Sequence, residues 1–216
     1  MNRNLNRWLN ENVVWIIIGL ISVFLFFAFL APILMKLDLT VQAKFIYRIY
    51  NAFCHQLAFR GYFLFGEQVF YPRRISGVNV EIYYEDITQS NLDLNYARDF
   101  LGNRLIGYKI ALCQRDIAIY GTFLITGIIF QVLKNKPKPI PWYIWVVVGL
   151  IPLGIDGVTQ FGGLGINLFS FLPVRESTPL LRTLTGSLFG ILTGLFIFPT
   201  LVEIGQIKSN EAENSE

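Results

Sequence analysis

The chain has 216 residues, of which 53% are hydrophobic and only 15% are charged, and its formal net charge is +3. This balance is typical of a membrane protein and argues against an ordinary soluble domain. The small and dispersed positive charge gives no basis for a nucleic-acid-binding function. Two cysteines allow one disulfide but no disulfide framework.

Four apolar segments predict four transmembrane helices. The first, residues 13–35, contains no charged residue, and it can cross roughly 30 Å of hydrocarbon at about 1.5 Å per residue. A cleaved signal peptide would have a shorter apolar core and a small-x-small cleavage site, which residues 29–32 do not provide. The other predicted spans cover residues 112–133, 142–160 and 179–204.

Residues 40–60 predict an amphipathic helix. Polar residues such as Lys44 and His55 recur at helical spacing on one side, and apolar residues such as Val41 and Phe53 recur on another. A helix with this pattern can lie in the membrane interface with its apolar face in lipid.

Residues 61–108 form the only sizeable polar segment. Residues 68–71 and 78–84 predict short strands around a turn, and residues 95–106 predict a short helix. Because this is too little chain for an independent core, we expect a small α/β cap that packs on the membrane ends of the helices. The predicted fold is thus an all-α four-helix membrane bundle with an interfacial helix and an extramembrane insertion.

The last part of the chain combines a glycine-rich loop, a helix and a tail. Residues 162–173 predict an irregular return loop, and residues 206–216 a disordered polar tail. Within the last predicted span, Gly186, Gly190 and Gly194 repeat every four residues, a pattern that lets membrane helices approach closely. This seam is expected to pack on another span of the same chain, with homo-oligomer formation as the alternative.

Four spans put both termini on one membrane face and the segments 36–111 and 161–178 on the other. Arg3, Arg7 and the basic loop 134–138 favour a cytoplasmic position for the termini. The expected location is the plasma membrane of a prokaryote.

This topology gathers the residues that carry chemistry at one membrane face. Both cysteines and the only histidine belong to this group. Asp156 lies deep in the third predicted span, where an ionisable group costs about 2.5–3.5 kcal/mol unless it has a partner or water. The set comprises Cys54, His55, Gln56, Cys113, Arg115, Asp116, Asp156, Gln160, Glu176 and Arg182.

One hypothesis is a zinc site that acts on a substrate. Thiolate, imidazole and carboxylate are the usual zinc ligands, so Cys54, His55 and Cys113 are candidate ligands, with Asp116 or Asp156 as fourth ligand or general base. The candidate catalytic residues are Asp156, Arg115, Arg182 and Glu176. Guanidinium groups suit the anionic group of a lipid-linked or small amphiphilic substrate.

The competing hypothesis is a structural or accessory membrane protein without enzymatic activity. In that case Cys54 and Cys113 form a disulfide, or the charged residues neutralise one another in an ion network that holds the helix ends together. The residues alone leave both hypotheses open.

Four sequence blocks resemble the prokaryotic predicted membrane proteins called domain of unknown function 2085. The blocks are Cys54-His55-Gln56, Cys113 with Arg115 and Ile119-Tyr120, Ile155 to Gln160, and Arg175 to Gly186. The resemblance supports the site but implies no reaction. Family members typically have a second cysteine where this chain has Asp116, and residues 66–108 look inserted.

Overall fold

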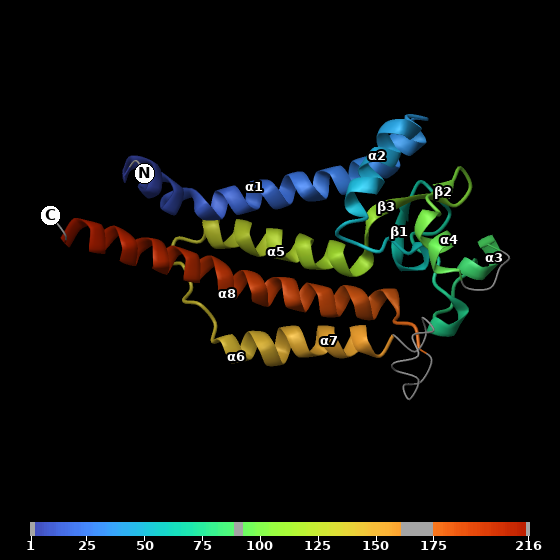
Figure 1. Cartoon of the computed structure of the whole chain (residues 1–216). Helices are drawn as coiled ribbons and strands as arrows, with labels where there is room; N and C mark the ends of the chain where they lie inside the picture. The colour runs from blue at the N-terminus through green and yellow to red at the C-terminus, as the bar shows by residue number, and fades with distance from the viewer. Residues whose placement is uncertain (1–2, 89–92, 161–174, 215–216) are drawn as a thin grey trace.

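The protein is described here from a computed structural model, in which residues 3–88, 93–160 and 175–214 are described. Long helices lie side by side, and a small α/β cap sits at one end of them (Figure 1). The return loop expected at residues 162–173 lies outside the described residues.

Among the described residues, three helices are long and apolar enough to cross a membrane. They are α1 (Arg3–Lys36), α5 (Gln114–Val132) and α8 (Pro179–Asn214). Only 17–22% of the most apolar window of each is buried within the protein. Most of their apolar surface therefore faces outward, as a lipid environment requires and water does not favour.

The remaining apolar segment is a shorter helix. It consists of α6 (Trp142–Ile144), a π-helical segment (Trp145–Leu150) and α7 (Ile151–Val158). It packs along α8, where the Trp145 indole nitrogen donates a 2.9 Å hydrogen bond to Thr193. The described structure therefore establishes three candidate membrane helices, and the predicted third span is a shorter apolar helix, Trp142–Val158.

The glycine seam of α8 packs on α5. A Cβ atom at Gly190 would lie 2.2 Å from the Thr122 hydroxyl oxygen and 2.4 Å from the Ile119 carbonyl oxygen. Thr122 uses the close approach to donate a hydrogen bond of 3.1 Å to the Ser187 carbonyl. The contact within the chain, which was the first expectation, is thus the one observed.

The cap contains a three-stranded antiparallel sheet in the order β1 (Gly61–Leu64), β3 (Gly107–Cys113), β2 (Gly102–Asn103). The strands predicted at residues 68–71 and 78–84 are wrong.

The Gln68 side chain explains why residues 78–84 need no strand partner. Its Oε1 accepts hydrogen bonds of 3.0 Å from the backbone amides of Glu81 and Ile82, and its Nε2 donates to the Ile82 carbonyl at 2.8 Å. One amide side chain therefore satisfies backbone groups that would otherwise require a sheet.

Short helices complete the cap. The helix predicted at residues 40–60 is α2 (Thr40–Tyr50), which is shorter because residues 51–53 form a turn. The helix predicted at 95–106 is α4 (Leu94–Asp99), which Asp93 caps. The remaining elements are η1 (Ala58–Arg60), η2 (Arg74–Ser76) and α3 (Tyr84–Thr88).

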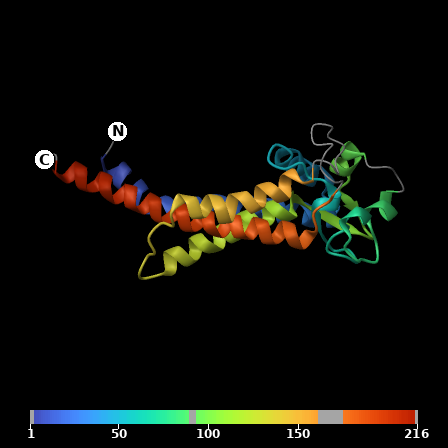
Figure 2. The ribbon, with the colours of Figure 1, turned by 90° about the horizontal axis from the view of Figure 1, so that it is seen from below.

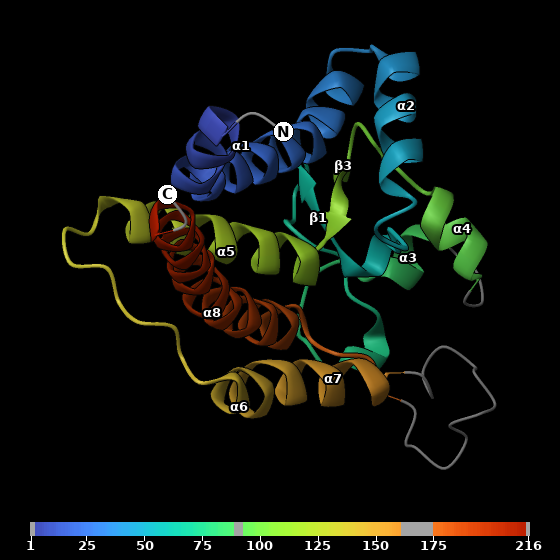
Figure 3. The ribbon, with the colours of Figure 1, turned by 60° about the vertical axis from the view of Figure 1, so that its left-hand side comes forward.

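The cap covers one end of the helices (Figures 2 and 3). The C-terminal ends of α1 and α7 and the N-terminal ends of α5 and α8 all meet it, whereas both chain termini lie at the opposite end (Figure 1). Helix α8 runs on to Asn214, across most of the residues 206–216 for which the sequence predicts disorder.

Candidate functional site

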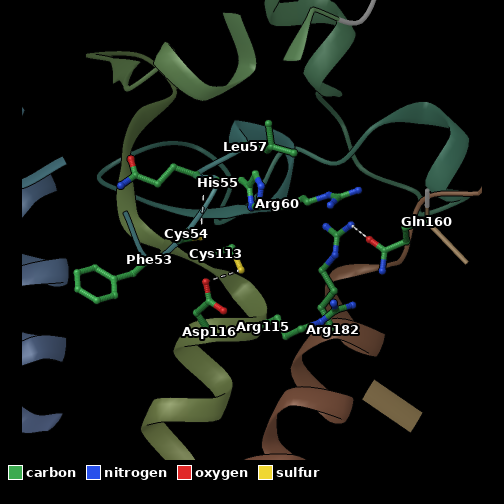
Figure 4. Close-up of a pocket in the computed structure, with 11 residues that line it drawn as sticks. Phe53, Cys54, His55, Leu57, Arg60, Cys113, Arg115, Asp116, Gln160 and Arg182 are labelled. Atoms are coloured by element: carbon green, nitrogen blue, oxygen red, sulfur yellow. Dashed lines mark hydrogen bonds between the residues drawn. The ribbon is translucent and has the colours of Figure 1, made fainter. Parts of the chain in front are cut away.

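A pocket lies between the cap and the helix ends (Figure 4). Its volume is about 200 Å³, well above the roughly 10–15 Å³ that one water needs. Most of the residues predicted for the site line it. The lining residues are Phe53, Cys54, His55, Gln56, Leu57, Arg60, Cys113, Arg115, Asp116, Gln160 and Arg182.

Cys113 and Asp116 are placed by a strand that runs directly into a membrane helix. Cys113 is both the last residue of β3 and the N-cap of α5, and Asp116 lies in the first turn of that helix. The Cys113 thiol donates a hydrogen bond of 3.1 Å to the Asp116 carboxylate. Their spacing of three residues along the chain thus puts both side chains on the pocket wall.

Cys54 is placed by the turn that ends α2. Its backbone amide donates to the Tyr50 carbonyl at 3.0 Å. Gln56 follows in a left-handed conformation (φ 52°), and its backbone amide points at the Cys54 sulfur at 3.5 Å. The Gln56 side chain then donates to the Tyr47 carbonyl at 2.9 Å, which anchors the turn on α2.

Three metal-ligand groups meet in the pocket. The ligand atoms of Cys54, Cys113 and Asp116 all lie within 4.8 Å of one another, and both thiols are free. The predicted fourth member, His55, is exposed and lies outside this group, although it lines the pocket. The structure therefore brings together three of the four predicted ligands.

The surroundings of Cys54 hold its thiol in the protonated form. A hydrogen bond with Cys113, burial, and the negative charges of Cys113 and Asp116 raise the pKa of the Cys54 thiol above its ordinary value. A cation between the three ligand atoms would reverse this effect, because metal binding displaces thiol protons.

Asp156 forms a buried ion pair with Arg115. Its carboxylate also accepts a 3.2 Å hydrogen bond from the Gln160 amide, and Arg175 lies 3.6 Å from its second oxygen. Asp156 and its partners link the end of α7 to the start of α5.

Glu176 is the centre of a second buried charge cluster. Arg60 donates to both of its carboxylate oxygens, at 2.8 and 3.0 Å, and Arg182 forms a close ion pair with it. Arg182 also donates to the Gln160 side-chain oxygen at 2.8 Å. Asp156 and Glu176, two of the predicted catalytic residues, thus lie behind the arginines of the pocket wall, as their ion-pair partners.

Sequence reasoning missed Lys109, which anchors the turn that carries Cys54 and Gln56. Its side chain is only 1% exposed, and its ammonium donates to the Gln56 carbonyl at 2.7 Å and to the Arg98 carbonyl. Burial lowers the pKa of Lys109 to about 7. The available signal is a lone lysine within the apolar run 106–113, the end of which belongs to the predicted span 112–133.

Sequence reasoning also missed Arg60. Arg60 is the last residue of the predicted amphipathic helix 40–60, and no sequence pattern pairs it with Glu176, which precedes the last helix by three residues.

The comparisons with known proteins agree with the motifs. Residues 103–196 match the family model described as predicted membrane protein (DUF2085). Over these residues the match bears out the family resemblance that the motifs indicate. The DUF2085 match includes Cys113, Asp116, Asp156 and Arg182, whereas Cys54 and His55 lie outside it.

A curated relative has no assigned activity in its name. The uncharacterized protein MJ1492 of Methanocaldococcus jannaschii is 28% identical over 198 residues, which cover 87% of this chain and 93% of the relative. No solved structure matches the chain. The match to the DUF2085 family model thus supports a membrane protein and assigns no chemistry to the site.

Proposed function

We propose that this membrane protein binds a thiophilic divalent metal ion, with zinc as the best match, through Cys54, Cys113 and Asp116. The observation that carries the proposal is the approach of the three ligand atoms to within 4.8 Å of one another. Two thiolates and one carboxylate form a donor set that zinc accepts.

The spacing suits a tetrahedral ion after small side-chain rotations. Zn–S bonds of about 2.3 Å at tetrahedral angles separate two sulfur atoms by about 3.8 Å. The present upper limit of 4.8 Å is about 1 Å larger, a difference that changes in cysteine rotamer can absorb. The Cys113–Asp116 contact of 3.1 Å is already shorter than a shared ion requires.

Three protein ligands leave one coordination position for water or substrate. Sites of this kind lower the pKa of bound water and polarise carbonyl or phosphoryl oxygens. Hydrolysis of a substrate that reaches the membrane face is therefore the activity the site fits best. His55, exposed at the rim of the pocket, is positioned for proton transfer with solvent and not for metal binding.

We further propose that the helix Trp142–Val158 is a fourth span. It has 17 residues, at the lower limit of about 17–25 for a transmembrane helix. It lies along nearly the same stretch of α8 as α5 does (Figure 1). Four passes put both termini on one face, and the basic loop 134–138 favours the cytoplasmic face of the plasma membrane.

The test is elemental analysis of the purified protein together with a free-thiol count. We expect close to one zinc per chain in the wild type, and loss of most of it in Cys113→Ser and Asp116→Asn. Asp38→Asn is the matched control, because Asp38 is an exposed carboxylate paired with Arg104 in the cap. A metal content that is negligible in the wild type, after purification without chelators and with added zinc, would refute the proposal.

The same distances also favour the structural alternative. Free thiols within 4.8 Å can form a disulfide. The ion pairs of Glu176 join the start of α8 to the cap, and those of Asp156 join α7 to α5. This alternative predicts no metal, no free thiols after purification under oxidising conditions, and lower thermal stability on reduction.

A further inference from the structure

We propose that Arg60, Arg115 and Arg182, on one wall of the pocket, form a binding site for a phosphate group, either free phosphate or the phosphate ester of a lipid. This deepens and rests on the proposed function, because the phosphate would lie in the same pocket as the metal ligands. Neither the family description nor the relative's name assigns a ligand to this site.

The charge balance around the pocket leaves an excess of positive charge. Four arginines face three carboxylates there, so the described cluster carries one unmatched positive charge if its thiols are protonated. A zinc ion with two thiolates adds no net charge, and the excess remains. The groups are Arg60, Arg115, Arg175 and Arg182 against Asp116, Asp156 and Glu176.

The three arginines of the pocket wall have little access to water that could solvate this excess charge. The Arg182 side chain is 2% exposed, and those of Arg60 and Arg115 are 19% and 21% exposed. Unbalanced charge with this little access to solvent is costly unless a counter-ion accompanies it. An anion in the pocket supplies that counter-ion.

One donor on the pocket wall still lacks an acceptor. The Nε–H group of Arg115 is buried and has no hydrogen-bond partner among the described residues. Buried donors in proteins are nearly always paired, so an unpaired one indicates a missing water or ion. Guanidinium groups bind phosphate oxygens in paired hydrogen bonds, which makes phosphate a suitable acceptor here.

The two helices that carry Arg115 and Arg182 reinforce the same preference. Each residue lies in the first turn of its helix, α5 or α8, and both helices begin at the pocket (Figure 4). Helix N-termini carry a partial positive charge that favours anions.

The rim of the pocket is continuous with an apolar surface. Phe53 lines the pocket and is 63% exposed, and Val41 and Phe45 on the neighbouring helix α2 are 78% and 64% exposed. Because α2 follows the membrane end of α1 after three residues, this surface lies at the level of the lipid headgroups. A lipid phosphate can therefore reach the arginines without leaving the membrane.

The test measures phosphate binding to the full chain in nanodiscs. Calorimetric titration with inorganic phosphate in neutral phosphatidylcholine discs probes the free anion. Native mass spectrometry after exposure to vesicles containing phosphatidic acid probes the lipid ester. Binding in only one arm identifies the source of the phosphate, and absence of binding in both arms overturns the proposal.

Arg60→Gln is the first variant, because Glu176 keeps Arg182 as its partner in the absence of Arg60. We expect phosphate or lipid binding to weaken about ten- to hundred-fold, the size of a lost charged hydrogen bond. Arg104→Gln is the control, since Arg104 is an exposed arginine of the same cap, and its effect should be less than about two-fold. Equal losses in both variants would mean nonspecific charge attraction and would overturn the site.

Two further variants keep the outcome interpretable. Arg60→Lys retains the charge and should keep the wild-type melting temperature, with binding intermediate between wild type and Arg60→Gln. If the lysine variant binds phosphate as the wild type does, the paired hydrogen bonds play no part and the proposed geometry is wrong. Cys54→Ser separates the two proposals, because it should abolish zinc binding but leave the three arginines in place. Phosphate binding retained by this variant would support the arginine site independently of the metal site.

Discussion

The sulfur atoms of Cys54 and Cys113 lie within 4.8 Å of each other, although the whole extramembrane cap separates the two residues in the sequence. Cys54 follows α2, and Cys113 is the N-cap of α5, a candidate membrane helix. Any bond between them, through a metal or as a disulfide, would therefore fasten the cap to the membrane bundle.

This relationship predicts competition between zinc and oxidation. Treatment with a mild thiol oxidant should form a Cys54–Cys113 disulfide in the metal-free protein, because the two thiols need only small rotations to meet. Bound zinc should slow this reaction about ten-fold or more, since coordinated thiolates are shielded from the oxidant. The loss of two hydrogens, measured by mass spectrometry of the intact protein, follows the reaction, and an oxidation rate unaffected by zinc would contradict shared ligation.

A second prediction concerns His55. Its exposed side chain lies outside the group of three ligand atoms, so His55→Ala should retain wild-type zinc content, whereas Asp116→Asn should lose most of it. If the site hydrolyses a substrate, His55→Ala should lower turnover and change its pH profile. Zinc loss in His55→Ala would instead restore the four-ligand site that the sequence suggests.

The features carried by chain topology could be predicted from the sequence. Cys54 and Cys113 flank one loop between two apolar segments, so they had to lie on the same membrane face. The seam at Gly190 was visible as a repeat of small residues, and its packing on α5 follows from the same repeat.

The features decided by tertiary contacts could not be predicted. The Gln68 side chain replaces a strand partner for Glu81 and Ile82, and no local pattern distinguishes such a glutamine from an exposed one. The pairing of Arg60 with Glu176 likewise depends on how the cap sits over α8. His55 was assigned as a ligand from residue type, but the turn after Asn51 directs it to the pocket rim.

Gly190 provides a test of the α5–α8 contact. Gly190→Ala should destabilise the bundle by about 1–3 kcal/mol, because the added methyl group would overlap the Thr122 hydroxyl and the α5 backbone. Gly121→Ala is the matched control, since a Cβ there has no neighbour within 4 Å. Alanine has a higher helix propensity than glycine, so this variant should not be destabilised. In thermal unfolding experiments in detergent, only Gly190→Ala should have a melting temperature below that of the wild type. Equal melting temperatures for both variants would contradict close packing of α8 on α5 at Gly190.

The last prediction concerns Lys109 and pH. Its pKa of about 7 in the folded protein lies below the ordinary value of 10.5, so between these values the unfolded chain binds more protons and stability should rise with pH. The raised pKa values of Cys54 and Tyr47 act in the opposite direction above about pH 9.

Stability of the wild type should therefore increase by about 2 kcal/mol from pH 7 to pH 9 and decrease beyond that. Lys109→Met removes the titrating group but leaves Arg98, Asp99, Cys54 and Tyr47 in place around it. The variant should be less stable at alkaline pH, because the Gln56 and Arg98 carbonyls lose their donor, and its stability should no longer rise between pH 7 and pH 9. Melting temperatures in detergent at pH 7, 8 and 9 measure this slope, and a rise that persists in Lys109→Met would assign the titration to another group.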